Sequence, residues 1–359
     1  MSPRLLLAAG FAALCATALP AQNLLVLSKT DTTLSIVDPL TLKVLARVPS
    51  GPDPHEIEAS TDGKLAFISN YGGGAYNTIT VVDLVAQKVL RTVDLGALRG
   101  PHGLMFAGGK IWFTAEAAKV IGSYDPATNQ VDWVLGTGQN RTHMIWVSAD
   151  LKRIVTSNVS SATLTFIDKT AGGGGRGPGG GPGGPGRGPG GPPPGAPGAR
   201  GGGGGRGPQV DWEETIVPVG RGAEGFDVSP DGKELWAANA QDGTLSILDM
   251  ASKKVTQTLT ANVSGANRLK FTPDGKRVFV STLNGPDVAV FDTATRAEIK
   301  RIPVGKGAAG ILMQPDGARA FVACTPDDYV VTIDLKTLAV TTHLNAGKQP
   351  DGMAWAVRR

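Results

Sequence analysis

Three of the four histidines in this chain occur in similar local settings, far apart in the sequence. Each follows a short turn signal and precedes an apolar run that is typical of a β-strand. The three phrases are Pro54-His55, Pro101-His102 and Thr142-His143. Imidazole nitrogens bind Zn, Cu, Fe and Mn, and a neutral imidazole also accepts protons near pH 7. A fold that brought these residues together would therefore create a site for metal binding or for acid–base chemistry.

The same position in later parts of the chain carries further side chains. Continuing the series gives Glu224, Asn267, Ala309 and Asp351. Three histidines together with a carboxylate would supply the nitrogen and oxygen ligands of a divalent ion such as Zn, Cu, Fe or Mn. We therefore predict catalytic roles for His55, His102, His143 and Glu224. We predict metal-binding roles for the same four residues and for Asp351. The alternative interpretation is that polar residues line a water-filled channel that binds no ion.

Basic and aromatic residues flank this series. Positive side chains around an opening attract anions, so a carboxylate or phosphate ligand is expected there. The residues predicted to bind it are Arg99, Arg141, Arg221, Arg268, Asn267, Tyr71 and Tyr76. Glu116 and Asn158 are further candidates. The alternative is that the cations only solvate their loops.

An internal repeat explains how residues so far apart could share one site. An apolar run that ends in Asp occurs seven times. Apart from one long gap the intervals are about 42 to 45 residues, the period of a four-stranded propeller blade. The seven residues are Asp38, Asp83, Asp125, Asp168, Asp249, Asp292 and Asp334. Their regular place before a turn predicts side-chain-to-backbone capping rather than catalysis. The chain is therefore predicted to be all-β, a seven-bladed β-propeller of four-stranded antiparallel blades.

Turn signals predict how the ring closes. A hairpin signal such as Pro230-Asp231-Gly232 precedes each Asp run except one. The missing signal falls where residues 355–359 end the chain and residues 23–27 begin its mature part. We predict that the N- and C-terminal strands share one blade, which removes open sheet edges. The first strand of each blade would lie nearest the axis, so the loops leading into these strands would bring the histidines and acids to one mouth of the channel.

The second strand of each predicted blade resembles the repeat of the YVTN family of β-propellers. Examples are Phe67-Ile68-Ser69-Asn70, Val155-Thr156-Ser157-Asn158 and Phe279-Val280-Ser281-Thr282. The resemblance implies a propeller of the lactonase-like kind but no single chemistry. We expect a protein that binds a small anionic ligand or a protein partner at its channel face, with a metal held by the axial histidines. The alternative is a metal-dependent hydrolase or lyase, similar to propeller lactonases or streptogramin lyases, and whether the chain is an enzyme stays open.

The ends of the chain and one insertion complete the predicted organisation. Residues 1–21 have the positive start, apolar stretch and small-residue cleavage site of a signal peptide, so the protein is expected to be periplasmic or secreted. Residues 22–359 are expected to form the propeller. Residues 172–208, rich in Gly, Pro and Arg, are predicted to be a disordered loop between the third and fourth strands of one blade. No later segment is long and apolar enough for a membrane span.

Composition narrows the partners. The formal net charge of +4 falls to about −1 once Arg4 and the four arginines of residues 172–208 are set aside. The basic pI therefore does not predict binding to nucleic acid. Cys324 is the only cysteine beyond the predicted signal peptide, so no intramolecular disulfide is expected. We expect a monomer.

Overall fold

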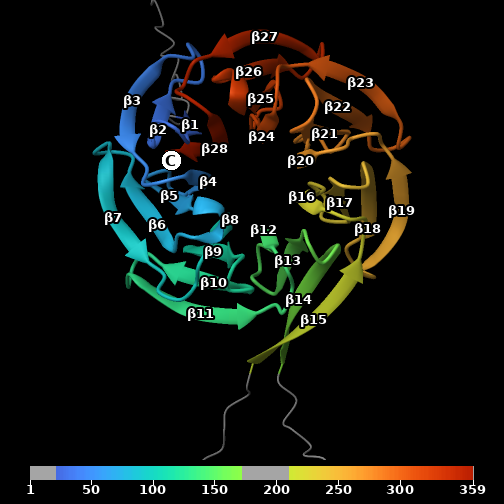
Figure 1. The fold of residues 1–359 in the computed structure, drawn as a ribbon, viewed down its shortest axis with the longest axis horizontal. Coiled ribbons are helices and arrows are strands. Elements are labelled where there is room, and N and C mark those ends of the chain that lie inside the picture. Colours follow the sequence, from blue (N-terminus) through green and yellow to red (C-terminus); the bar gives the residue numbers. More distant parts are fainter. Residues whose placement is uncertain (1–21, 172–209, 359) are drawn as a thin grey trace, which may run out of the picture.

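The computed structural model describes residues 22–171 and 210–358. These residues form seven four-stranded antiparallel sheets, arranged as blades around a central axis (Figure 1). The predicted all-β class and the predicted seven blades are confirmed. The predictions of a signal peptide at 1–21 and of a disordered loop at 172–208 concern segments outside the described residues.

Within each blade the strands run outward from the axis in chain order (Figure 1). The innermost strands are β4 (Pro54–Ala59), β8 (Pro101–Ala107), β12 (Thr142–Val147), β16 (Ala223–Val228), β20 (Ala266–Phe271), β24 (Ala308–Met313) and β28 (Pro350–Val357). The second strands are β5 (Leu65–Asn70), β9 (Lys110–Ala115), β13 (Arg153–Asn158), β17 (Glu234–Asn239), β21 (Arg277–Thr282), β25 (Arg319–Cys324) and β1 (Gln22–Ser28).

The outer half of each blade follows the same order. The third strands are β6 (Thr78–Asp83), β10 (Val120–Asp125), β14 (Thr163–Ala171), β18 (Thr244–Asp249), β22 (Asp287–Asp292), β26 (Tyr329–Asp334) and β2 (Thr33–Val37). The outermost strands are β7 (Lys88–Asp94), β11 (Gln130–Gly136), β15 (Val210–Pro218), β19 (Lys254–Thr260), β23 (Glu298–Pro303), β27 (Ala339–Leu344) and β3 (Val44–Pro49). Two short 3-10 helices, η1 (Gly72–Gly74) and η2 (Thr325–Asp327), lie in the loops after β5 and β25.

The predicted closure of the ring is confirmed. β1 pairs antiparallel with both β2 and β28, so the end of the chain supplies the innermost strand of the blade in which the described chain begins. The pairing runs from Gln22 opposite Val357 to Ser28 opposite Pro350. The hydrogen bonds of this blade therefore hold the two ends of the ring together, and they bring Asp351 to the axis.

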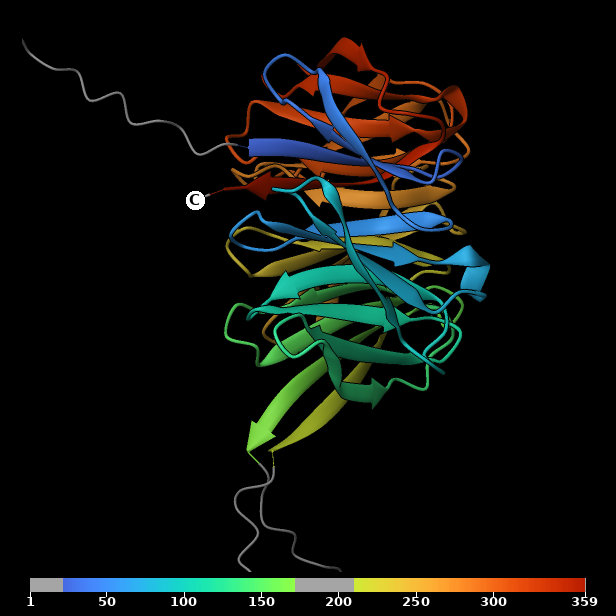
Figure 2. The same ribbon diagram turned by 90° about the vertical axis from the view of Figure 1, so that its left-hand side faces the viewer.

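Aspartates cap the turns between third and fourth strands, as predicted. Asp83 Oδ1, for example, accepts hydrogen bonds from two backbone N–H groups of the following turn, at 2.9 and 2.8 Å. Asp168 differs because β14 and β15 continue past this position, each to a length of nine residues, and it pairs instead with Arg153 and Lys253. Figure 2 shows these two strands extending beyond the rest of the ring. The capping aspartates thus belong to the scaffold.

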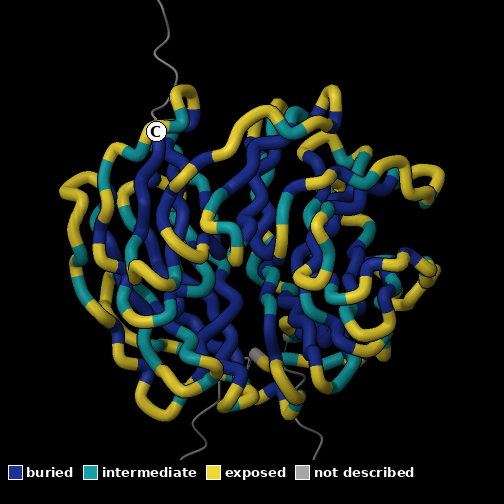
Figure 3. Tube along the Cα trace, turned by 45° about the horizontal axis from the view of Figure 1, so that its top comes forward, coloured by how far each residue is buried: buried dark blue, intermediate teal, exposed yellow. Residues whose placement is uncertain are grey.

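Hydrophobic cores lie between neighbouring blades. In the described part of the chain there are seven clusters of buried apolar side chains, one at each junction of two blades. Large aromatic side chains fill these junctions, and the fully buried ones are Phe67, Phe113, Tyr124, Phe166, Trp236, Phe279 and Phe321. Figure 3 shows the buried strands inside the ring and the exposed residues at its loops. Removing one buried Phe side chain typically costs about 3–5 kcal/mol of stability.

Glycines let the innermost strands approach one another closely at the axis. A Cβ on Gly103 would lie 2.5 Å from the carbonyl oxygen of His143, and a Cβ on Gly352 would lie 2.4 Å from that of His55. Both distances are shorter than van der Waals contact, so a side chain at either position would push the neighbouring strand away. The close approach of β8 to β12 and of β28 to β4 places the residues at the start of these strands within contact distance.

The gap in the described chain lies at the end of one hairpin. β14 and β15 pair along their whole length, up to Ala171 opposite Val210. The chain therefore leaves and re-enters the described part between a third and a fourth strand. Within residues 22–171 and 210–358, no helix has the length and apolar character needed to cross a membrane.

Candidate metal and ligand site at the axial mouth

The three histidines meet at one mouth of the axial channel. His55, His102 and His143 are the second residues of β4, β8 and β12, which are neighbours in the ring. The ring centroids of His55 and His102 are 4.3 Å apart, and those of His102 and His143 are 3.8 Å apart. The imidazoles therefore form one contiguous group with His102 in the middle. Their catalytic and metal-binding roles stay predictions.

His102 is enclosed without a polar partner. It is 1 % exposed, and neither Nδ1 nor Nε2 has a hydrogen-bond partner among the described residues. A buried polar atom without a partner costs about 1–3 kcal/mol, so such atoms often mark the place of a ligand, water or ion. Burial, together with His143 and His55, lowers the pKa of His102 well below its ordinary value. His102 is thus a neutral imidazole with a free nitrogen lone pair, which is the form that binds metal ions.

His143 lies between two carboxylates. Its Nδ1 is 2.5 Å from Glu116 Oε1, and its Nε2 is 2.8 Å from Glu224 Oε2, the second contact being an ion pair without hydrogen-bond alignment. Burial disfavours the imidazolium, but Glu224 and Glu116 outweigh burial and raise the pKa of His143. Burial also opposes ionisation of Glu224, yet His143 and Arg141 hold the pKa of Glu224 at about 2. Both carboxylates are therefore ionised and able to serve as oxygen ligands.

A second charged group surrounds His55. Lys29 Nζ lies 2.5 Å from His55 Nδ1 and 3.1 Å from Asp351 Oδ2. Asp351 Oδ2 is 3.3 Å from the same ring nitrogen, and Asp53 Oδ1 contacts Lys29 at 3.5 Å. Burial lowers the pKa of His55, and the opposing effect of Asp351 is smaller. His55 therefore accepts a hydrogen bond from Lys29 as a neutral imidazole.

Tyr71 and Arg141 complete the mouth. The Tyr71 hydroxyl donates to Glu116 Oε2 over 2.5 Å, and its ring packs edge-on against His102 with centroids 4.9 Å apart. Burial and Glu116 raise the pKa of Tyr71, which stays a neutral hydrogen-bond donor. The Arg141 guanidinium is 44 % exposed and lies 3.7 Å from both Glu116 and Glu224. An incoming anion can therefore reach Arg141 from solvent.

Three of the residues predicted to bind the anion lie on exposed loops. Arg99 is exposed and donates to a backbone carbonyl of the β5–β6 loop, while Arg221 pairs with Asp242 at 2.7 Å. Tyr76 is 41 % exposed, and its ring lies against Gly72. The predicted collar of positive charge is thus partly neutralised by the protein's own acids, and its role in ligand binding stays a prediction.

Arg268 and Asn267 lie in β20, next to the axis. Arg268 is 5 % exposed, forms a hydrogen-bonded ion pair with Glu56 of β4, and contacts Asn267 Oδ1 at 3.2 Å. Because β4 and β20 are not neighbours in the ring, the Arg268–Glu56 pair reaches across the axis. It separates a mouth chamber, lined by the histidines, from a far chamber on its other side. The expectation of Arg268 as a free cation at the mouth is thereby corrected.

Two residues of the mouth stand out only in the structure. Lys29 is absent from the predicted set, and Glu116 stands there only as a further candidate. Both directly follow the second strand of their blade, as Tyr71 does. Aligning this position across the blades gives Lys29, Tyr71, Glu116, Val159, Ala240, Leu283 and Thr325. That alignment is the sequence signal that would have found the three polar residues. Asn158 instead ends β13 and donates to Thr163 and Thr165, so it is structural.

The side chains present fit a divalent metal ion. His102, Glu116 and His143 each offer one ligand atom, and these atoms lie within 4.8 Å of one another, as do those of His55, Glu56 and His102. Ligand atoms about 2.1 Å from a tetrahedral metal are roughly 3.4 Å apart, so side-chain shifts of about 1 Å would complete either group. Two imidazoles and a carboxylate form a donor set that suits Zn and similar metals.

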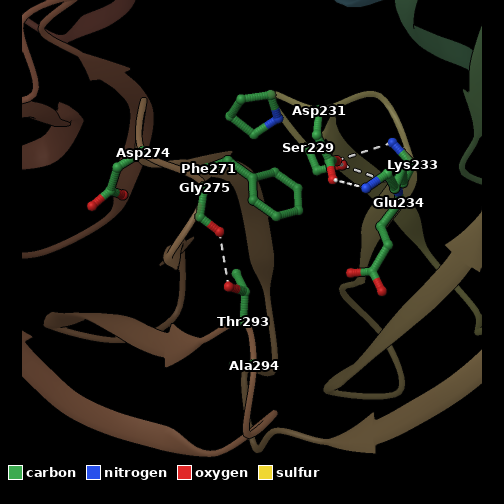
Figure 4. A pocket seen from close by; sticks show the side chains of 10 residues that line it. Ser229, Asp231, Lys233, Glu234, Phe271, Asp274, Gly275, Thr293 and Ala294 are labelled. Atoms are coloured by element: carbon green, nitrogen blue, oxygen red, sulfur yellow. Dashed lines mark hydrogen bonds and ion pairs between the residues drawn. The ribbon is translucent and has the colours of Figure 1, made fainter.

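A pocket at the opposite end of the blades shows the same scaffold without this chemistry (Figure 4). It has a volume of about 320 Å³ and lies between the β16–β17 and β20–β21 turns. Its polar groups serve local structure, since Asp231 accepts hydrogen bonds from Ser229 at 2.7 Å and from the backbone of Lys233 at 3.1 Å. Glu234 pairs with Arg296. None of the predicted site residues lines this pocket.

The closed ring of four-stranded blades makes this chain a seven-bladed β-propeller, with an architecture found in lactonase-like propellers. No protein-family model matches the sequence, and no curated protein matches it.

Solved structures show the same fold. The chain is similar to a functionally unknown protein from Desulfotomaculum acetoxidans, with a TM-score of 0.71 and 12 % identity over 94 % of this chain and 99 % of that one. It is similar to a candidate 6-phosphogluconolactonase from Bacteroides fragilis, with a TM-score of 0.67 and 16 % identity over 95 % and 99 %. It is also similar to dihydro-haem d1 dehydrogenase, with a TM-score of 0.60 and 16 % identity over 91 % of this chain and 64 % of that one. At such identities the likeness establishes the fold and not the activity.

Proposed function

We propose that this protein holds one divalent transition-metal ion at the mouth of its channel and binds a small anionic molecule beside it. His102, His143 and Glu116 would be the metal ligands. The observation that carries the proposal is His102, whose ring nitrogens are buried without a partner in the described chain while two further ligand atoms lie within 4.8 Å. An ion would satisfy His102 and compensate the negative charges of Glu116 and Glu224.

The residues around these ligands have distinct roles in the proposal. Tyr71 donates a hydrogen bond to Glu116 and so fixes this carboxylate, as outer groups do in metal sites. Arg141 would pair with the carboxylate or phosphate of an incoming ligand, because it is the exposed cation beside Glu116 and Glu224. When bound, the metal would supply a Lewis acid that polarises an oxygen of the ligand.

A second candidate function, that of a metal-dependent hydrolase or lyase, is favoured by the group around His55. His55 is a neutral imidazole whose ring lies 4.3 Å from that of His102, and Lys29 and Asp351 hold it in place. It could therefore accept a proton from water, or from a carbon next to a carbonyl group of the ligand. The fold shared with a candidate 6-phosphogluconolactonase agrees with hydrolysis of a small anionic lactone.

Metal analysis of protein purified without a histidine tag tests the proposal. We expect one equivalent of metal per chain after dialysis against Zn, Cu, Fe or Mn, and its loss in His102→Ala. His343→Ala is the matched control, because His343 is exposed in the outermost strand β27 and is the one histidine of the sequence outside the mouth. If the wild-type protein bound none of the four metals, the proposal would fail, and a propeller that binds a ligand or protein partner without an ion would remain.

We further propose that the protein is exported and monomeric, because residues 1–21 have the pattern of a signal peptide. N-terminal sequencing of the protein from its native host should give a start near residue 22. An N-terminus at residue 1 would contradict export, and a dimer in light scattering would contradict the monomer.

A further inference from the structure

The far chamber has chemistry that differs from that of the mouth. It is a cavity of about 300 Å³ lined by residues from all seven innermost strands, and the Glu56–Arg268 pair separates it from the histidines. Its walls are largely apolar and include Met105, Met144 and Trp146. Cavities of this size, with apolar walls and a few convergent polar groups, are typical of small-molecule sites.

Three charged side chains, one residue or more beyond the Glu56–Arg268 pair, point to the kind of molecule. They are Glu58, Asp227 and Lys270, in β4, β16 and β20. Lys270 Nζ lies 3.6 Å from Asp227 Oδ1, and Asp227 Oδ2 also accepts a backbone N–H at 3.0 Å. Within the described part of the chain, no hydrogen bond or ion pair engages the carboxylate of Glu58.

The charges of the far chamber therefore do not balance. Glu56 pairs with Arg268 and Asp227 pairs with Lys270, which leaves Glu58 as the negative group without a partner. Burial raises the pKa of Glu58 to about 7, as expected for an enclosed carboxylate that lacks a compensating cation. A ligand that carries a positive charge would supply this cation.

We infer that the far chamber binds a small apolar amine, whose ammonium group pairs with Glu58 and whose apolar part packs against Trp146 and the methionines. A tryptophan ring attracts a cation through its negative face, and the flexible thioethers of Met105 and Met144 adapt to an apolar ligand. Because the Glu56–Arg268 pair lies between the chambers, this site is independent of the proposed metal.

Calorimetric titration of the full chain with benzylamine tests this inference. Benzyl alcohol and phenylacetate are its neutral and anionic counterparts. At pH 8, where Glu58 is ionised and benzylamine is an ammonium ion, we expect benzylamine to bind at least tenfold more tightly than benzyl alcohol. Phenylacetate should not bind. Equal affinities for benzylamine and benzyl alcohol, or no binding of benzylamine, would overturn the inference.

Two variants locate the effect. Glu58→Gln should weaken benzylamine binding at least tenfold while leaving the affinity for benzyl alcohol and the metal content unchanged. Lys270→Met removes the cation that competes for the carboxylate, so benzylamine should bind more tightly. This second variant keeps the inference testable if Glu58→Gln does not fold, and unchanged affinity in the variants that fold would contradict it. Benzylamine binding should persist in His102→Ala, which distinguishes failure of this site from failure of the metal site.

Discussion

The two sides of the propeller mouth use the same strands but carry different side chains. In five consecutive blades the second residue of the innermost strand is polar: Asp351, His55, His102, His143 or Glu224. In the other two blades this position holds Asn267 and Ala309, and the loops after the second strand supply Leu283 and Thr325 instead of Lys29, Tyr71 and Glu116. The hydrophobic junctions, in contrast, are present all round the ring. The repeat therefore specifies the ring, while the chemistry depends on two positions per blade that the ring does not require.

The largest effect is expected in the cores, where the two sides are alike. Phe113 lies at the junction between the blades of His55 and His102, Phe279 lies at a junction on the other side, and both are fully buried. Phe113→Ala and Phe279→Ala should each lower the free energy of unfolding by about 3–5 kcal/mol, because each leaves a cavity. Chemical denaturation measures both values. A cost confined to one side would show that the scaffold is not equivalent around the ring.

The next effect extends the comparison along the axis, to the far chamber. Below pH 4.5 Glu58 is protonated in the folded and in the unfolded chain. Between pH 4.5 and about 7 the unfolded chain releases this proton while the folded protein keeps it, so the folded state loses up to about 3 kcal/mol of stability. Glu58→Gln should therefore match the wild type at pH 4 and exceed its stability at pH 8. Denaturation curves at the two pH values would refute this if the difference did not change with pH.

A smaller effect compares one position on the two sides of the mouth. Tyr71→Phe removes the hydrogen bond to Glu116 and should weaken metal binding about 10–100-fold, as loss of an outer group does in other metal sites. Leu283→Ala changes the corresponding position on the other side and should leave metal affinity unchanged. Competition with a chelator measures both affinities. Equal losses in the two variants would remove the distinction between the sides.

The smallest effect concerns a turn cap that all sides of the ring share. Asp83→Ala removes two hydrogen bonds to backbone N–H groups and should cost about 1 kcal/mol of stability. Asp83→Asn keeps the accepting oxygen and should cost less. Metal content should not change in either variant, and a change would mean that the capping aspartates affect the mouth.

The sequence could predict the ring and the row of histidines because both depend on a repeat. Seven Asp-terminated runs set the number of blades, and the missing hairpin signal predicted the shared blade. The equivalent positions of His55, His102 and His143 predicted that they would meet. None of this depends on where a long side chain points.

The partners of long side chains could not be predicted in the same way. Lys29 meets Asp351, 322 residues away, only because the ring closes. Arg268 follows the mouth residue Asn267, but alternation along the strand turns it to the axis, where it meets Glu56 of a distant blade. The vacancy beside Glu58 depends in turn on which cations are already paired.

Anomalous X-ray diffraction from crystals of zinc-loaded protein tests the central claim most directly. We predict one strong peak at the mouth, about 2.1 Å from a nitrogen of His102, a nitrogen of His143 and an oxygen of Glu116. A zinc-loaded crystal with no peak at the mouth, or with peaks only at exposed carboxylates, would contradict the account.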